Sequence, residues 1–225
     1  MNKRLIAIDT ETTGVSKDSK ICEIAWSELD ENLNVARSGY SLINPGVPIP
    51  YAAAAVNGIT DAMVADAPFM DEYMAGEGAD LIGADVLLVA HHAEFDYKYL
   101  KPYLHDETTT LCTLKCARHV WPDAENHKQA TLAYMLGIAV DRAKAHSADG
   151  DIEVLIGVLR ALLEETGAGI EGLLHIQALP RVITRQPWGK HKGKLLTDVP
   201  RDYVVWMLTK CDNLSDDLRA ALIAL

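Results

Sequence analysis

Two acidic residues separated by one position follow the first apolar run of the chain. Asp9 and Glu11 come directly after residues 5–8 (LIAI), which are typical of a buried strand. Side chains two positions apart on a strand share a face, so these carboxylates would converge and repel each other unless a cation lies between them. Oxygen ligands favour Mg²⁺ or Mn²⁺. Asp-x-Glu is also common on surfaces, but a surface pair is least expected directly after a buried run.

A turn follows these two acids. Thr12, Thr13 and Gly14 can bring backbone N–H groups close to a bound ligand, because glycine permits a close approach of the main chain.

A third acidic residue, Asp96, follows a second apolar run in the segment AHHAEFD (90–96). We expect it at the start of a helix, as a further metal ligand, as an outer group behind the ligands, or as a charge that the helix dipole favours. His91, His92 and Asp96 also suggest a zinc site, but no cysteine partner accompanies them.

A histidine and an aspartate flank the start of the longest predicted helix. His146 and Asp151 are five positions apart, which separates them by about 140° on a helix. They therefore fit better as a histidine in the preceding loop and an aspartate on the helix. The histidine would then face a water molecule that the aspartate helps to hold; the alternative is a solvent-exposed loop histidine.

Charge is distributed unevenly along the chain. The 225 residues carry a net charge of −11, which argues against a protein that coats phosphates without specificity. Residues 181–195 nevertheless contain five Lys and Arg and no acid, with Lys190, Lys192 and Lys194 close to Trp188. Such a patch suits a polyanion held at one face. The alternatives are a solvated lysine-rich turn and a Trp188 that belongs to a small core.

The elements that must position these groups follow from apolar periodicity and turn residues. Three successive strands, followed by strands that alternate with helices, indicate an α/β fold with a mixed sheet. The glycine-rich stretch 167–172 is the best linker, and beyond it a hairpin over 181–197 precedes two short helices. Strands are predicted over 4–8, 21–29, 35–43 and 85–90, and helices over 68–81, 94–104, 114–120, 128–136, 147–165, 202–208 and 215–225, with Thr60 as the cap of a further short helix.

Composition excludes several classes of protein. With 49% hydrophobic and 24% charged residues, the chain is not disordered, collagen-like or a coiled coil. We expect no membrane span and no signal peptide, because no apolar run is long enough. The four scattered cysteines are expected to be free thiols in a reducing cytoplasm.

Taken together, the motifs resemble those of the DEDDh family of 3′→5′ exonucleases, which have a ribonuclease H-like fold. The resemblance covers residues 3–165 and rests on DTETTG (9–14), AHHAEFD (90–96) and HSADGD (146–151) in this order. The stretches 59–68, 114–122 and 188–207 carry a closer match to one branch of the family. The resemblance implies a mixed five-stranded sheet flanked by helices, followed by a small C-terminal hairpin-helix module.

The resemblance also implies a role for each residue of the motifs. Two metal ions about 4 Å apart would hold the scissile phosphate, while His146 acts as general base towards the attacking water. The metal carboxylates would be Asp9, Glu11, Asp96 and Asp151, and the groups that meet the 3′-terminal nucleotide would include Thr12, Thr13, Gly14, His92 and Phe95.

Two positions depart from the family pattern. Relatives often carry His where this chain has Asn57, and usually Asn where it has His92. Neither position is a catalytic ligand, so the departures concern contacts with the terminal nucleotide.

The sequence therefore predicts a metal-dependent 3′→5′ DNA exonuclease that releases 5′-mononucleotides and needs no obligate protein partner. An exonuclease domain is expected over 1–166, a linker over 167–180, and a basic DNA-binding module over 181–225. Alternatives are an RNA exonuclease, a polymerase proofreading subunit and a catalytically silent DNA-binding protein.

Overall fold

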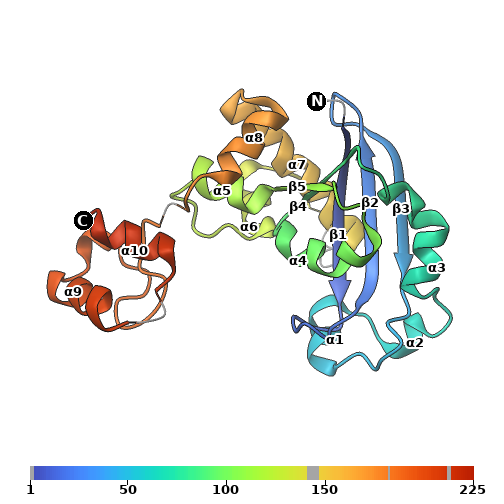
Figure 1. Cartoon of the computed structure of the whole chain (residues 1–225), viewed down its shortest axis with the longest axis horizontal. Helices are drawn as coiled ribbons and strands as arrows, with labels where there is room; N and C mark the ends of the chain where they lie inside the picture. Colours follow the sequence, from blue (N-terminus) through green and yellow to red (C-terminus); the bar gives the residue numbers. More distant parts are fainter. Residues whose placement is uncertain (1–2, 141–146, 182, 212–213) are drawn as a thin grey trace.

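A mixed five-stranded sheet forms the centre of the protein (Figure 1). The computed structural model describes residues 3–140, 147–181, 183–211 and 214–225. The strand order is β3-β2-β1-β4-β5, with β1 antiparallel to β2 and parallel to β4. The predicted fold class is thereby confirmed. The strands are β1 (Arg4–Thr12), β2 (Ile21–Leu29), β3 (Val35–Leu42), β4 (Val86–Ala90) and β5 (Thr109–Cys112).

The two faces of the sheet pack against different helices. On β1, Leu5 and Ala7 face one core with the long helix α7, while Ile6 and Ile8 face the other core. This alternation is the period-2 geometry expected of a strand buried on both sides. The first core includes α5 (Thr113–Val120), α6 (Gln129–Leu136), α7 (Ala148–Thr166) and α8 (Gly169–Ala178); the second includes α3 (Met70–Ala75), η1 (Glu77–Leu81) and α4 (Ala93–Leu100).

Several elements differ from the sequence-based expectation. β1 continues to Thr12 rather than ending at Ile8, because β2 pairs with it along its whole acidic end. The predicted helix over 68–81 is interrupted at Gly76, and α4 stops before Pro102, where a short turn η2 (Lys101–Tyr103) follows. Strand β5 and helix α1 (Tyr51–Asn57) were not predicted, whereas α2 (Asp61–Val64) begins after Thr60 as expected.

The stretch expected as a linker contains helix α8, which packs on the main body. Leu173 is fully buried in the core shared with α5 and α7. Gln177 is bonded to β5, because its side chain accepts from Cys112 N at 2.7 Å and donates to Thr110 O at 2.9 Å. Apolar residues at helical spacing outweigh the glycines here. The chain leaves the main body only after α8.

The C-terminal residues form a small module of their own, placed apart from the sheet in Figure 1. It contains η3 (Leu196–Asp198), α9 (Arg201–Lys210) and α10 (Asp216–Ile223), packed around Val204, Met207 and Leu218. The expected hairpin is reduced to a loop with one isolated bridge between Arg185 and Leu195. Its turn has positive φ at Gly189 and Gly193, a conformation that glycine adopts without strain.

No helix among the described residues combines the length and apolarity needed to cross a membrane.

Candidate active site

Three carboxylates meet at the end of β1. Asp9 and Glu11 lie on the face of the strand that looks towards α7, and Asp151 comes from the first turn of that helix. One oxygen from each lies within 4.8 Å of the others. Like charges at this separation repel each other, and a donor set made only of carboxylate oxygens fits a hard divalent cation. The residues present therefore fit the divalent metal that the resemblance to the exonuclease family implies.

Burial and mutual repulsion make it unfavourable for all three carboxylates to be ionised at once. Burial, followed by the charges of Asp96 and Asp151, raises the pKa of Asp9 well above its ordinary value. Burial, followed by the charge of Glu23, raises the pKa of Glu11 to about 7, and a hydrogen bond from Asn57 opposes this. A bound cation would relieve the repulsion between the three carboxylates.

Asp96 reaches the same strand from the opposite side of the sheet. It lies on α4, is almost fully buried, and its Oδ1 accepts hydrogen bonds from Thr10 N at 3.1 Å and Thr10 Oγ1 at 2.7 Å. Burial raises the pKa of Asp96 to about 7. The structure therefore ties Asp96 to the residue between Asp9 and Glu11 and leaves it outside the group of three.

We predict that Asp151→Asn reduces turnover more than Asp96→Asn. Asparagine at position 96 keeps the oxygen that Thr10 binds. The loss of turnover should therefore be about 10–100-fold, as for a group that acts on the metal through another residue. At position 151 the change removes a charge from the three-carboxylate group, and we expect at least a further factor of about 10. Steady-state kcat of both variants is the measurement, and equal losses would contradict the different positions assigned to the two groups.

Sequence reasoning missed Glu23, a buried acid on β2 directly opposite Glu11. Its Oε2 accepts a hydrogen bond from Ala148 N at 2.9 Å, and its Oε1 accepts one from Tyr40 Oη at 2.7 Å. Ala148 is the first residue of α7, so Glu23 holds the end of the helix that carries Asp151. An acid inside the apolar segment ICEIAW was the signal that could have revealed it.

Glu23→Ala is expected to lower the free energy of unfolding by about 1–3 kcal/mol, because the buried N–H of Ala148 and the half-exposed hydroxyl of Tyr40 lose their acceptor. It should also lower kcat about 10-fold by loosening the start of α7. Glu23→Gln is the matched control, since its amide can accept from Ala148 N and donate to Tyr40. Urea unfolding and kcat are the two measurements. If both variants were equally impaired, charge rather than helix placement would be the role of Glu23.

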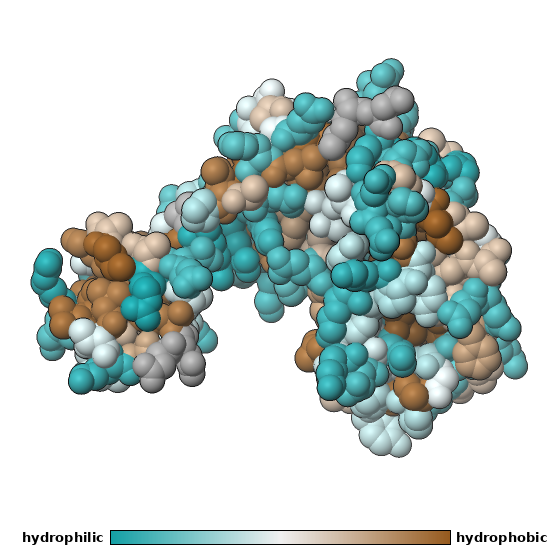
Figure 2. Space-filling model, viewed as in Figure 1, coloured by the Kyte–Doolittle hydropathy of each residue, from teal (hydrophilic) through white to brown (hydrophobic). Residues whose placement is uncertain are grey.

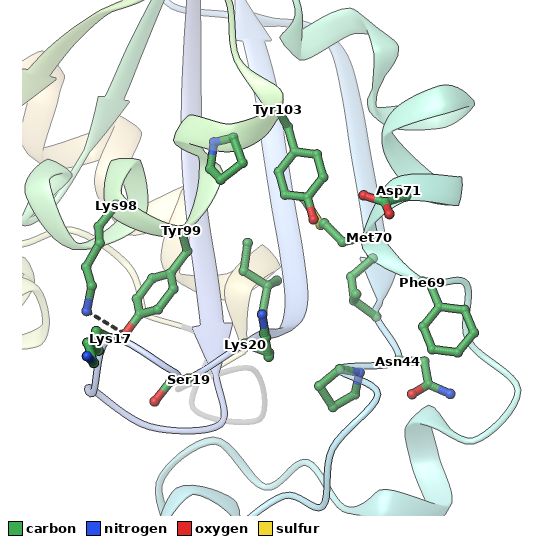
Figure 3. Close-up of a pocket in the computed structure, with 14 residues that line it drawn as sticks. Lys17, Ser19, Lys20, Asn44, Phe69, Met70, Asp71, Lys98, Tyr99 and Tyr103 are labelled. Carbon is green, nitrogen blue, oxygen red and sulfur yellow. Dashed lines mark hydrogen bonds between the residues drawn. The ribbon is translucent and has the colours of Figure 1, made fainter.

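The turn after β1 is fixed against α4. Thr12 Oγ1 donates to Gly14 O at 2.6 Å, and Thr13 N donates to Lys20 O at 2.8 Å. Figure 3 shows Lys98 and Tyr99 side by side, with their polar ends pointing towards the loop that follows β1; both donate to Ser16 O, at 3.1 and 2.8 Å. The loop closes a pocket of about 310 Å³ on the α3 and α4 side of the sheet. The turn is therefore held in place beside the acidic group.

The two positions that depart from the family pattern lie near the cluster. Asn57 Nδ2 donates to Thr12 O at 3.3 Å, in addition to its bond with Glu11. His92 is exposed at the start of α4 with φ of 86°, a left-handed conformation in which asparagine is also favoured. Its ring lies 6.2 Å from the ring of Phe95, which is half-buried.

The histidines give no support to the zinc alternative. His91 Nε2 donates to His127 O at 2.8 Å, and Nδ1 lies 2.9 Å from Thr113 Oγ1. Burial lowers the pKa of His91 to about 4, so the ring is neutral near pH 7. Within the described ranges, the group able to hold a metal consists of carboxylates only. The predicted general base, His146, lies outside the described residues.

Comparisons with known proteins agree with this geometry. A family model described as an exonuclease, RNase_T, matches residues 6–159, and a second model, QSregVF_b, described as a quorum-sensing-regulated virulence factor, matches residues 175–211. The chain is 31% identical to exodeoxyribonuclease 10 of Escherichia coli (strain K12) over 220 residues, which cover 96% of this chain and 95% of that protein. It is 34% identical to the DNA polymerase III subunit epsilon of Pasteurella multocida, over 69% of this chain and 66% of that one.

A solved structure of exonuclease X in complex with 5′-overhanging duplex DNA superposes with a TM-score of 0.64 at 28% identity. The match covers 77% of this chain and 99% of that chain. The chain therefore belongs to the RNase_T exonuclease family, as a 3′→5′ exonuclease of the DEDDh type with a ribonuclease H-like fold.

Proposed function

We propose that this protein is a metal-dependent 3′→5′ exodeoxyribonuclease that hydrolyses phosphodiester bonds of DNA and releases 5′-mononucleotides. The observation that carries the proposal is the convergence of Asp9, Glu11 and Asp151 within 4.8 Å. DNA is favoured as substrate because the Escherichia coli relative is called an exodeoxyribonuclease and the exonuclease X structure contains duplex DNA.

In the proposed mechanism each residue has a separate task. The carboxylates of Asp9, Glu11 and Asp151 would hold two Mg²⁺ or Mn²⁺ ions, which would supply positive charge to the scissile phosphate and the leaving oxygen. Asp96 fixes the strand between the ligands through Thr10. The turn at residues 12–14, together with His92 and Phe95, orients the 3′-terminal nucleotide. His146 takes a proton from the attacking water, a role that suits an imidazole with an ordinary pKa near 6.5.

The C-terminal module, which we propose to span 181–225, holds DNA and does no chemistry. Lys190, Lys192 and Lys194 are exposed on its loop. Beside them, the ring of His191 lies 4.6 Å from that of Tyr203, which lies 5.3 Å from Trp206. Partly exposed rings among cations suit base stacking and backbone contact. Trp188 and Trp206 are 39% and 46% exposed, which argues against a purely structural core role.

Changing Lys190, Lys192 and Lys194 together to Ala is expected to weaken DNA binding and to lower the salt slope by up to about 3. Removal of residues 181–225, which spares α8, should have a larger effect on binding and processivity while turnover of short oligonucleotides survives. Affinity measured across a salt series tests both, with Arg160→Ala on α7 as the control for loss of charge. Unchanged affinity and slope in the triple variant would leave the module a structural or protein-contacting role.

One alternative has a specific observation in its favour. Similarity to a polymerase III epsilon subunit suits a proofreading role. The match to exodeoxyribonuclease 10 over 95% of its length, C-terminal module included, favours a self-contained enzyme instead. We also propose a cytoplasmic location, which agrees with the free thiols of the four cysteines.

The test of the proposed function is digestion of single- and double-stranded DNA and RNA, labelled at either end, with Mg²⁺ or with a chelator. The proposal expects mononucleotides from the 3′ end of DNA, and only with metal. Stepwise loss from the 5′ end, or full activity in chelator, would overturn it. Faster digestion of RNA than DNA would move the assignment to an RNA exonuclease.

A further inference from the structure

A cationic pocket lies beside the acidic cluster, between α5 and α6. Its volume is about 540 Å³, and Arg118, Lys128 and Arg181 line it together with His127 and Gln129. Among the described residues that line it, none is acidic. Three cations around one hollow are unexpected in a chain with a net charge of −11.

The two arginines of this pocket lie close enough for their charges to interact. Burial, followed by the charge of Arg181, lowers the pKa of Arg118, and the charge of Glu94 opposes this. Of the nearby acids, Glu94 pairs with Lys115 at 2.6 Å, and Asp217 accepts the backbone N–H of Arg181 at 3.3 Å. Within the described parts of the chain, neither guanidinium forms an ion pair. A bound anion would remove this unfavourable arrangement.

The lysine of the pocket stands on a rigid loop. His91 donates to His127 O at 2.8 Å, and His127 Nε2 donates in turn to Trp121 O at 2.9 Å. Lys128 N donates to Asn126 Oδ1 at 2.9 Å, and Lys128 directly precedes α6, whose start has no side-chain cap. The loop and the positive end of the helix are therefore fixed before any ligand arrives.

A single side chain links the pocket to the active site. Gln129, in the wall of the pocket, donates from Nε2 to the backbone carbonyl of Asp151. A nucleic acid strand whose 3′ end lies at Asp9, Glu11 and Asp151 therefore has this pocket as an immediate neighbour.

We propose that Arg118, Lys128 and Arg181 bind internucleotide phosphates upstream of the scissile bond. The proposal rests on the proposed function, because it takes the 3′ end to lie at the acidic cluster. Guanidinium and ammonium groups recognise phosphate oxygens by charge-assisted hydrogen bonds, so the site reads the backbone and not the bases. Since Arg181 begins the C-terminal module, a phosphate held here would also join that module to the main body.

The experiment compares the substrates dT2 and dT8 in the full-length protein. A dT2 dinucleotide has only the scissile phosphate, whereas dT8 has six further phosphates upstream. The variants are Arg118→Gln with Lys128→Gln, the charge-preserving Arg118→Lys, and Arg160→Gln as a matched arginine control away from the pocket. We expect the double variant to lose about 10-fold or more in kcat/KM on dT8, with dT2 changed less than about twofold.

Binding of dT8 in chelator, where no cleavage occurs, gives an independent measurement. The double variant should lower the log–log salt slope by about 1.4, because each single-strand phosphate contact contributes about 0.7. Arg118→Lys should retain most of the affinity, and Arg160→Gln all of it. Equal losses of kcat/KM on dT2 and dT8, or an unchanged salt slope, would overturn the proposal that this pocket binds phosphates. Failure of the wild-type protein to cleave either oligonucleotide with metal would overturn the proposed function, while the binding series still decides the pocket.

Discussion

Asp9→Ala is expected to abolish phosphodiester hydrolysis while the protein stays folded. Asp9 contributes one of the three carboxylates that lie within 4.8 Å of one another, so its loss should remove metal binding at the site. Activity is measured on a 3′-labelled oligonucleotide at saturating Mg²⁺ and again at saturating Mn²⁺. Near-normal turnover under either condition would show that Asp9 does not hold the catalytic metal.

Stability provides the matching control for this variant. Burial and neighbouring carboxylates raise the pKa of Asp9, so the folded protein keeps a proton that the unfolded chain has lost. Such a group lowers stability as the pH rises from its ordinary pKa to its folded pKa. Glu11, whose pKa is about 7, acts in the same direction between pH 4.5 and 7.

In chelator, the midpoint of thermal unfolding of the wild-type protein should therefore fall as the pH rises through this window. Asp9→Ala should be as stable as the wild type or more so at pH 7.5, because one buried carboxyl is gone. Mn²⁺ should raise the midpoint of the wild type and leave that of the variant unchanged. A variant unfolded at pH 7.5 would make its inactivity uninformative about metal binding.

The part of the site that depends on local spacing could be predicted from the sequence. Strand alternation alone places Asp9 and Glu11 on one face, and the helical start of α7 places Asp151 at its first turn. Where Asp96 lies relative to the sheet could not be predicted in this way. Asp96 lies near the end of β1 because α4 follows β4, which pairs parallel to β1, and this depends on the order of the strands.

The contacts of Glu23 could not be predicted from the sequence either. Its position opposite Glu11 follows from the register between β1 and β2, and its bond to Ala148 joins residues 125 positions apart. No local pattern fixes a register or a contact of this length. An acidic residue within an apolar strand signals a buried partner, but the partner is identified only once the sheet is assembled.

The predicted linker over 167–180 differs from the structure for another reason. Glycines near 167–172 favoured a linker, yet Leu173 and Gln177 dock α8 on the main body. Packing of an amphipathic helix outweighs the helix propensity of a few glycines, each of which costs about 1 kcal/mol. The predicted domain boundary at 166 therefore falls before a helix that the structure joins to the exonuclease fold.

His146→Ala is expected to lower kcat by about 10² to 10⁴, the usual contribution of a general base. His146 directly precedes Ser147, the residue before α7, and so it is joined covalently to the helix that carries Asp151. Because the imidazole is proposed as a base and not as a ligand, calorimetry should give nearly wild-type Mn²⁺ affinity. His175→Ala, at an exposed histidine on α8, is the matched control and should retain full activity.

The pH profile separates a base from a histidine that only packs. In the wild type, kcat should rise with pH up to a pKa near 6.5, since the base must be neutral to accept a proton. The variant should lose this limb of the profile, and its residual rate should depend on pH only through the metal-binding carboxylates. If the limb persisted in His146→Ala, or if Mn²⁺ affinity collapsed, His146 would not be the base, and in the second case it would be a metal ligand.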